Sequence, residues 1–229
     1  MSRLALADVL NVFVKHPRPG AVKSRLAARI GPDRAAAVYR AIADEEIRRT
    51  APRRDEYERL FFFAPPESRQ DLEEWLPGQV LVPQVDGDLG TRMKSALAHA
   101  FGQGARRAAL IGTDVPSLDR EDVLGAFESL DEHDVVVGPA TDGGYYLLAT
   151  KRPEPELFRD VPWSTPQVLA ATLDRAARLG RSVRVLRTLG DVDTPEDLAA
   201  DWTRIARLLP EPLRQEVGGL IGRSAPLSD

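Results

Sequence analysis

Cysteine is absent from this chain of 229 residues and histidine occurs only three times, which excludes several kinds of site. Without cysteine there is no disulfide, iron–sulfur cluster, thiolate zinc site or cysteine nucleophile. The three histidines, His16, His99 and His133, cannot readily build a histidine-rich metal site. Carboxylates remain as metal ligands, and their oxygens suit hard divalent cations such as Mg2+.

Long apolar runs and a large excess of either charge are also missing. No apolar stretch approaches the roughly 18 residues of a membrane span, and the opening 1–8 is too short and too soon acidic for a signal peptide. We therefore expect a cytoplasmic protein that does not contact membranes. With 31 basic against 35 acidic side chains, the formal charge of -4 gives no general attraction to nucleic acid, although a local basic cluster could bind a small anionic substrate.

Short apolar runs alternate with helical patterns along the chain. This alternation predicts a three-layer α/β fold, with a mostly parallel seven-stranded sheet and helices on both faces. The length is near the usual limit of one domain, so we expect a single domain over 1–229 with a frayed tail at about 218–229. The predicted strands are 10–15, 59–64, 79–83, 107–113, 134–138, 145–150 and 183–188. The predicted helices are 21–30, 33–50, 67–76, 89–101, 120–130, 166–179 and 195–208.

One pair of predicted strands departs from the alternation. Only residues 139–144 separate the strands at 134–138 and 145–150, which leaves no room for a crossover helix. We therefore expect these two strands to form an antiparallel or offset pair.

Two acidic segments each place carboxylates just beyond a predicted strand. Residues 112–116 (Gly-Thr-Asp-Val-Pro) carry Asp114, and residues 190–195 (Gly-Asp-Val-Asp-Thr-Pro) carry Asp191 and Asp193. Ligands of open α/β sheets bind beyond the carboxyl ends of the strands, so aspartates from both segments could meet over one ligand. Mg2+ takes oxygen ligands and usually shares them with substrate phosphates. The two segments together therefore suggest a metal site.

Helix capping is the alternative explanation for both segments. Thr194 is predicted to cap a helix that starts at Pro195, with Asp197 completing a capping box. Ser117 or Asp119 is predicted to cap the helix after the first segment. Such caps do not account for the aspartates that precede them.

A basic segment, residues 15–26, lies where the first strand ends and a helix should start. Helix N-termini bind anions through free backbone N–H groups and the helix dipole, and glycine allows close backbone approach. The alternative is a Pro-Gly turn with solvated charges, because an apolar stripe of Val22, Leu26 and Ile30 already explains the helix. Since the basic side chains lie outside this stripe, we expect them to bind phosphate rather than to support folding. The residues concerned are Lys15, Gly20, Lys23 and Arg25.

Three further segments have both a structural and a functional explanation. Residues 142–144 (Asp-Gly-Gly), before Tyr145, form either a plain hairpin turn or a close approach to a ligand. Residues 86–93 form a turn and a helix start, and could bind a ligand through Arg92. Trp163 is either a core residue or a platform for a sugar or base.

In this order, the segments resemble a family of GT-A-fold proteins, described as glycosyltransferase A type or as transferases associated with radical-SAM and selenium-domain genes and with arsenosugar biosynthesis. The resemblance covers nearly the whole chain. That family is similar to nucleotidyltransferases such as the molybdenum-cofactor and phospholactate guanylyltransferases, and to sugar-phosphate cytidylyltransferases. The resemblance implies a fold of the GT-A, nucleotide-diphosphosugar-transferase type. The matching segments are 15–26, 87–93, 110–118, 138–148, 163–166 and 191–198.

By this resemblance, Asp114 and Asp193 would bind Mg2+ (or Mn2+), while Gly20, Lys23 and Arg25 would hold a triphosphate. The chain differs from the related enzymes in two respects. Its N-terminal segment lacks the Gly-x-Gly-Thr-Arg loop of sugar nucleotidylyltransferases, and no Asp-x-Asp occurs at Asp114.

The preferred hypothesis is a metal-dependent nucleotidyltransferase, in which an acceptor phosphate or hydroxyl attacks the α-phosphorus of a nucleoside triphosphate and pyrophosphate leaves. The alternative is transfer of a sugar from a nucleotide-sugar to a small-molecule acceptor, and a third possibility is a non-catalytic nucleotide-binding module. The base, the acceptor and the oligomeric state stay open. The assigned roles are catalysis for Lys23, Arg25 and Asp142, nucleotide binding for Lys15, Gly20, Asp88, Gly90 and Arg92, acceptor binding for Gly143, Gly144, Tyr145 and Trp163, and metal binding for Asp114 and Asp193.

Overall fold

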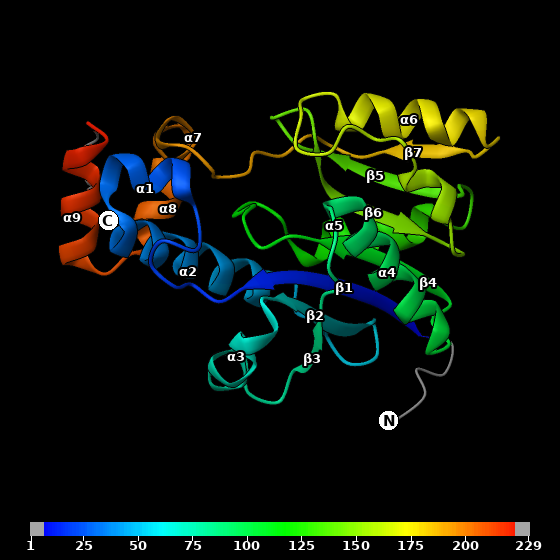
Figure 1. Cartoon of the computed structure of the whole chain (residues 1–229), viewed down its shortest axis with the longest axis horizontal. Coiled ribbons are helices and arrows are strands. Elements are labelled where there is room, and N and C mark those ends of the chain that lie inside the picture. The colour runs from blue at the N-terminus through cyan, green and yellow to red at the C-terminus, as the bar shows by residue number, and fades with distance from the viewer. Residues whose placement is uncertain (1–6, 223–229) are drawn as a thin grey trace.

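A seven-stranded sheet forms the centre of the molecule (Figure 1), in a computed structural model that describes residues 7–222. The strand order is β3-β2-β1-β4-β6-β5-β7, and within these residues β6 alone runs antiparallel to its neighbours. All seven predicted strands and the antiparallel pairing of β5 with β6 are confirmed. The strands are β1 (Asp8–Lys15), β2 (Glu58–Ala64), β3 (Val80–Pro83), β4 (Arg107–Ile111), β5 (Val135–Pro139), β6 (Tyr145–Thr150) and β7 (Val183–Val185).

Helices surround the sheet, and several begin at residues that the sequence marks. Asp119 caps α5 through a capping box with Asp122, and Thr194 caps α7 through a capping box with Asp197, which confirms the predicted cap at Thr194. No helix within the described residues is long and apolar enough to cross a membrane. The α-helices are α1 (Ser24–Ile30), α2 (Pro32–Arg49), α3 (Arg69–Trp75), α4 (Leu89–Gly102), α5 (Arg120–Ser129), α6 (Val168–Arg178), α7 (Pro195–Ala200), α8 (Trp202–Ile205) and α9 (Glu211–Leu220). Short 3-10 helices are η1 (Pro66–Ser68), η2 (Pro155–Phe158) and η3 (Ala206–Leu208).

The buried apolar side chains form three clusters. On one face of the sheet, α3, α5 and one side of α2 pack against the strands, and on the other face α4 and α6 do so. Parallel strands need both faces covered, which is why β5 is buried along its whole length. The third cluster lies beyond the sheet and joins α1, α7, α8, η3 and α9 to the other side of α2 (Figure 1). We refer to α1, α7, α8, η3 and α9 as the helical cluster.

The C-terminal region differs from the sequence expectation. The helix predicted at 195–208 is divided into α7, α8 and η3, because Asp201 adopts a non-helical conformation between the first two. Helix α9 was not predicted, and it runs to Leu220, into the segment that the sequence suggests as a frayed tail. The remainder of the predicted tail, 223–229, lies outside the described residues.

Candidate active site

The carboxyl ends of the parallel strands bring the two acidic segments to one edge of the sheet. Asp114 lies three residues beyond the end of β4 at Ile111, and the segment between β7 and α7 returns beside it. A backbone hydrogen bond joins them, because the N–H of Val192 donates to the carbonyl oxygen of Asp114 at 3.0 Å. Residues nearly 80 positions apart are therefore held side by side.

Lys23 lies between the two predicted metal ligands. Its Nζ atom is 3.2 Å from Oδ2 of Asp114 and 2.5 Å from Oδ1 of Asp193, and its side chain is only 7% exposed. Both carboxylates thus contact one positively charged group. The cation found there is the ammonium group of Lys23.

The backbone at Lys23 explains how its side chain reaches this position. Lys23 has φ 48° and ψ 50°, a left-handed conformation that is unfavourable for a residue other than glycine. Helix α1 therefore begins at Ser24, not at residue 21 as predicted. The irregular start also lets Arg25 approach the site, with Nη2 at 3.9 Å from Oδ2 of Asp193.

The charges at this edge act strongly on one another. Burial tends to lower the pKa of Lys23, but the charges of Asp114 and Asp193 have the larger, opposite effect. The pKa of Lys23 is therefore raised above its usual value, and the side chain is protonated. Burial likewise tends to raise the pKa of Asp193, but Lys23, Arg25 and Lys15 together lower it below its usual value. The pair formed by Lys23 and Asp193 is therefore ionised at neutral pH.

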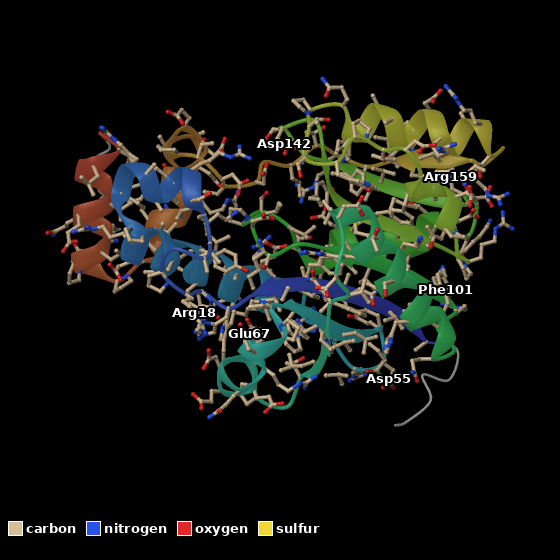
Figure 2. All side chains as sticks on the ribbon, viewed as in Figure 1. Arg18, Asp55, Glu67, Phe101, Asp142 and Arg159 are labelled. Atoms are coloured by element: carbon tan, nitrogen blue, oxygen red, sulfur yellow. The ribbon has the colours of Figure 1, made fainter. Side chains whose placement is uncertain are left out.

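Two more carboxylates complete the acidic part of the site. Burial, followed by the charges of Asp114, Asp142 and Asp193, raises the pKa of Asp191 to about 6. From the residues alone, either Asp191 or Asp193 could be the ligand, and in the structure the charges of both Asp114 and Asp193 act on Asp191. Figure 2 shows Asp142 on the loop between β5 and β6, where its Oδ1 accepts a hydrogen bond from the N–H of Gly144 at 2.8 Å.

Helix α2 contributes two buried polar side chains that sequence reasoning missed. The hydroxyl of Tyr39 lies 2.9 Å from Oγ1 of Thr113, and Oε2 of Glu46 accepts a hydrogen bond from the N–H of Val115 at 2.7 Å. Both residues contact the segment that carries Asp114. A glutamate within the apolar face of a predicted helix was the signal available in the sequence, because buried carboxyl groups are rare without a specific partner.

We expect Glu46→Gln to stabilise the metal-free protein increasingly as the pH rises. Burial and the nearby charge of Asp114 raise the pKa of Glu46 well above its usual value. As the pH rises, Glu46 therefore loses its proton in the unfolded chain at a lower pH than in the folded protein. Above pH 4.5 the unfolding free energy then falls by at most about 1.4 kcal/mol per pH unit, until Glu46 also loses its proton in the folded protein. Glutamine lacks this loss, so the difference in unfolding free energy from wild type should grow between pH 5 and pH 8 in chelator-containing buffer. A difference that stays constant with pH would contradict a raised pKa.

The remaining residues assigned to phosphate lie on the same side as Lys23. Lys15 is exposed at the end of β1 and contributes to the lowered pKa of Asp193. Gly20 has φ 80° in a turn whose backbone hydrogen bond runs from the N–H of Ala21 to the carbonyl of Arg18. A Cβ atom on Gly20 would have no other atom within 4 Å, so the turn leaves room for a ligand.

The residues at the start of α4 form a second group with its own contacts. Asp88 caps α4 by accepting a hydrogen bond from the N–H of Thr91, and Nε of Arg92 donates to the carbonyl oxygen of Gly87 at 3.0 Å. A Cβ atom on Gly90 would lie 2.4 Å from the indole of Trp163. Each of these residues thus has a structural role, and Asp88 and Gly90 also line a polar hollow of about 240 Å3.

Three of the four residues assigned to the acceptor also have structural roles. Tyr145 is nearly buried, with its hydroxyl 3.9 Å from Sδ of Met93, and Trp163 stacks on Phe158. Gly143 has φ 89°, and a Cβ atom there would lie 2.2 Å from the carbonyl oxygen of Pro166. Gly144 remains at the surface beside Asp142, and is the best placed of the four to meet an acceptor.

The two aspartates fit a divalent cation by their donor chemistry. They already surround one positive charge, and their oxygens are the ligands that Mg2+ or Mn2+ prefers. Within residues 7–222, no three or more acidic or histidine side chains converge as a complete metal cage. One or two carboxylates, with water and phosphate oxygens, are the usual way in which proteins hold Mg2+.

Comparison with known proteins places the chain in a bacterial family. Residues 47–165, more than half of the chain, match the family described as uncharacterized protein conserved in bacteria (DUF2064). The chain belongs to this family. The DUF2064 match includes Asp114 and Asp142 but ends before Asp193.

Two proteins similar to this chain are named as transferases. A protein from Desulfovibrio desulfuricans G20, named as a candidate nucleotide-diphospho-sugar transferase, is 31% identical, with a TM-score of 0.84 over 94% of this chain and 96% of that one. A 2-phospho-L-lactate guanylyltransferase from Methanopyrus kandleri is 36% identical over 92 residues, which cover 39% of this chain and about half (46%) of that enzyme.

The fold also occurs in an enzyme crystallised with a nucleotide. A CMP:2-keto-3-deoxy-manno-octonic acid synthetase in complex with CTP superposes with a TM-score of 0.55, covering 89% of this chain and 100% of that one. Its sequence identity is 15%, so this likeness concerns the fold alone. The α/β fold of the nucleotide-diphospho-sugar transferases, expected from the sequence, is confirmed.

Proposed function

We propose that the protein is a Mg2+- or Mn2+-dependent nucleotidyltransferase that joins the nucleotidyl group of a nucleoside triphosphate to a small-molecule acceptor and releases pyrophosphate. The observation that carries this proposal is the meeting of Asp114 and Asp193 at the ammonium group of Lys23, within the basic segment that follows β1. The relation to a guanylyltransferase supports nucleotidyl transfer. The predicted cytoplasmic location stays a prediction.

The charges of the site suit this reaction. Asp114 and Asp193 would hold the divalent cation, which supplies positive charge beside the reacting α-phosphate. Lys15, Lys23 and Arg25 would offset the negative charge that develops on the departing pyrophosphate. Phosphoryl chemistry of this kind depends mainly on positioning and charge, so little covalent help is needed.

A base for the acceptor is available on the acidic side of the site. Burial, and then the charges of Asp114, Asp142 and Asp193, raise the pKa of Asp191 to about 6 in the metal-free protein. An ionised carboxylate within hydrogen-bonding reach of an attacking hydroxyl can accept its proton. Asp142 and Asp191 are therefore the two candidates for this role, and an attacking phosphate would need neither.

Glycosyl transfer is the second candidate, because the Desulfovibrio relative is named for nucleotide-diphospho-sugars. The two reactions leave different products. Nucleotidyl transfer releases pyrophosphate from a nucleoside triphosphate, whereas glycosyl transfer releases a nucleotide from a nucleotide-sugar. The basic segment after β1 favours the first, since a leaving pyrophosphate needs several positive charges.

The test is to supply each nucleoside triphosphate and each common nucleotide-sugar with Mg2+ and a mixture of phosphorylated and hydroxylated metabolites. Pyrophosphate release that requires both metal and acceptor supports the proposal, and nucleotide release from a nucleotide-sugar supports the second candidate. A bound nucleotide should raise the unfolding free energy by about 2.7 kcal/mol at one hundred times Kd. Such stabilisation without any product would instead indicate a nucleotide-binding module.

Lys23→Met should weaken nucleotide binding and also destabilise the metal-free protein. The sequence predicts little effect on folding, but the buried ammonium group separates two carboxylates, and its loss leaves them facing each other. We expect a cost of about 1 to 3 kcal/mol, less than for a fully buried pair, because Asp114 and Asp193 are 38% and 36% exposed. Added Mg2+ should restore this loss in urea unfolding experiments.

Lys151→Met provides the control, since Lys151 pairs with Asp134 away from the site. Its unfolding free energy should respond to Mg2+ as that of the wild type does. If Mg2+ raised the unfolding free energies of Lys23→Met and Lys151→Met equally, the ammonium group of Lys23 would not lie where the divalent cation binds.

A further inference from the structure

Helix α2 carries two polar side chains on a face that is otherwise buried among apolar ones. Tyr39 and Glu46 are seven residues apart, which is two helical turns, so both point to the same side. Tyr39 is 5% exposed and Glu46 is fully buried. Their neighbours on this face, Ala36 and Ala43, belong to the apolar cluster between α2 and the sheet.

Both side chains reach the three residues centred on Asp114. The hydroxyl of Tyr39 contacts the hydroxyl of Thr113 and accepts a hydrogen bond from the N–H of Lys15 at 3.1 Å. Oε2 of Glu46 accepts from the N–H of Val115 at 2.7 Å. The residues on either side of Asp114 are thus each tied to α2 by one hydrogen bond.

This arrangement costs stability, so packing alone does not account for it. Burying a carboxyl group is unfavourable unless its hydrogen-bonding capacity is used in full. Among the described residues, Oε1 of Glu46 has no hydrogen-bond partner. What Glu46 does provide is a fixed acceptor for the one backbone N–H that follows Asp114.

We infer that Glu46, assisted by Tyr39, is a positioning residue that fixes the backbone of residues 113–115 so that the Asp114 carboxylate stays directed at the cation site. The inference rests on the proposed function, because it needs Asp114 to bind a cation. Groups that hold metal ligands in place typically change metal affinity by about 10- to 100-fold when they are removed.

The test compares four variants of the full chain by titration with Mn2+, without nucleotide. Glu46→Leu keeps a side chain of similar size but leaves the N–H of Val115 without an acceptor. Glu46→Gln keeps an oxygen that can accept this hydrogen bond. Tyr39→Phe removes the contact with Thr113. Its matched control is Tyr57→Phe, which removes a buried hydrogen bond from Tyr57 to the carbonyl of Thr50 without touching residues 113–115.

We expect Glu46→Leu to weaken Mn2+ binding by about 10- to 100-fold, Tyr39→Phe to weaken it less, and Glu46→Gln and Tyr57→Phe to bind like the wild type. Hydrogen exchange of the Val115 amide should be faster in Glu46→Leu than in Glu46→Gln, even without metal. If Glu46→Leu does not fold, the Mn2+ affinity of Tyr39→Phe, compared with that of Tyr57→Phe, tests the positioning role.

Wild-type Mn2+ affinity and Val115 exchange in Glu46→Leu or Tyr39→Phe would overturn the positioning role while leaving the proposed function intact. A wild-type protein that binds no Mn2+ would overturn the shared-cation site, and the inference with it. Equal losses in Tyr39→Phe and Tyr57→Phe would show that the hydrogen bonds serve folding alone.

Discussion

Asp114→Asn or Asp193→Asn should each lower metal-dependent turnover on the order of 1000-fold while leaving the protein folded. Each change removes one of the two carboxylates that would hold the cation, and cation charge contributes several kcal/mol to such reactions. Folding should change little, because Lys23 keeps the other aspartate as a partner. Turnover is measured as pyrophosphate release at saturating Mg2+, and folding by urea unfolding without metal.

The double variant separates catalysis from folding. Its activity should be hardly lower than that of either single variant, because groups that act on one cation are not additive. Its stability should fall clearly, because Lys23 is then a buried ammonium group without either carboxylate. Asp131→Asn is the control, since Asp131 is exposed and pairs with Arg107 near the other end of β4. A fully active Asp114→Asn protein would exclude the shared-cation site.

Gly143→Ala should destabilise the protein by about 2 to 5 kcal/mol, through a collision and backbone strain. Its Cβ atom would lie 2.2 Å from the carbonyl oxygen of Pro166, and neither backbone can move freely, because the N–H of Leu169 donates to the carbonyl of Gly143 at 3.0 Å. The sequence suggests that Gly143 serves the acceptor, whereas this packing predicts that folding suffers first.

Gly180→Ala separates the two causes. Gly180 has φ 64°, similar to the φ 89° of Gly143, but a Cβ atom there would have nothing within 4 Å. It should therefore show only the backbone strain, about 1 to 2 kcal/mol. The measurement is the unfolding free energy of both variants, and equal losses would show that the contact with Pro166 relaxes at no cost.

The sheet was predictable because its strands are short apolar runs bounded by turn residues. That the two acidic segments would meet also followed from the sequence, since both lie beyond strand ends, whereas the choice of Asp193 over Asp191 came from the family resemblance. The exact partners were less accessible. Lys23 reaches the aspartates through a left-handed backbone conformation, which local sequence patterns do not indicate for a lysine.

Tertiary contacts explain the other differences. Glu46 was predicted only as part of a helix, because its partner Val115 is 69 positions away. Gly90 and Trp163 were both assigned to ligands, yet each is explained by its contact with the other. Helix α9 has two glycines and few apolar residues, so its formation depends on the helical cluster against which Val217 packs.

The two buried sides of α2 have a consequence for the rigidity of the site. One side packs against the sheet that carries Asp114, and the other packs against the helical cluster that includes α7, next to Asp193. A helix buried on both sides cannot shift toward one without opening a cavity on the other. The segments that carry the two carboxylates are therefore braced from both sides of one helix, which limits how far they can move apart.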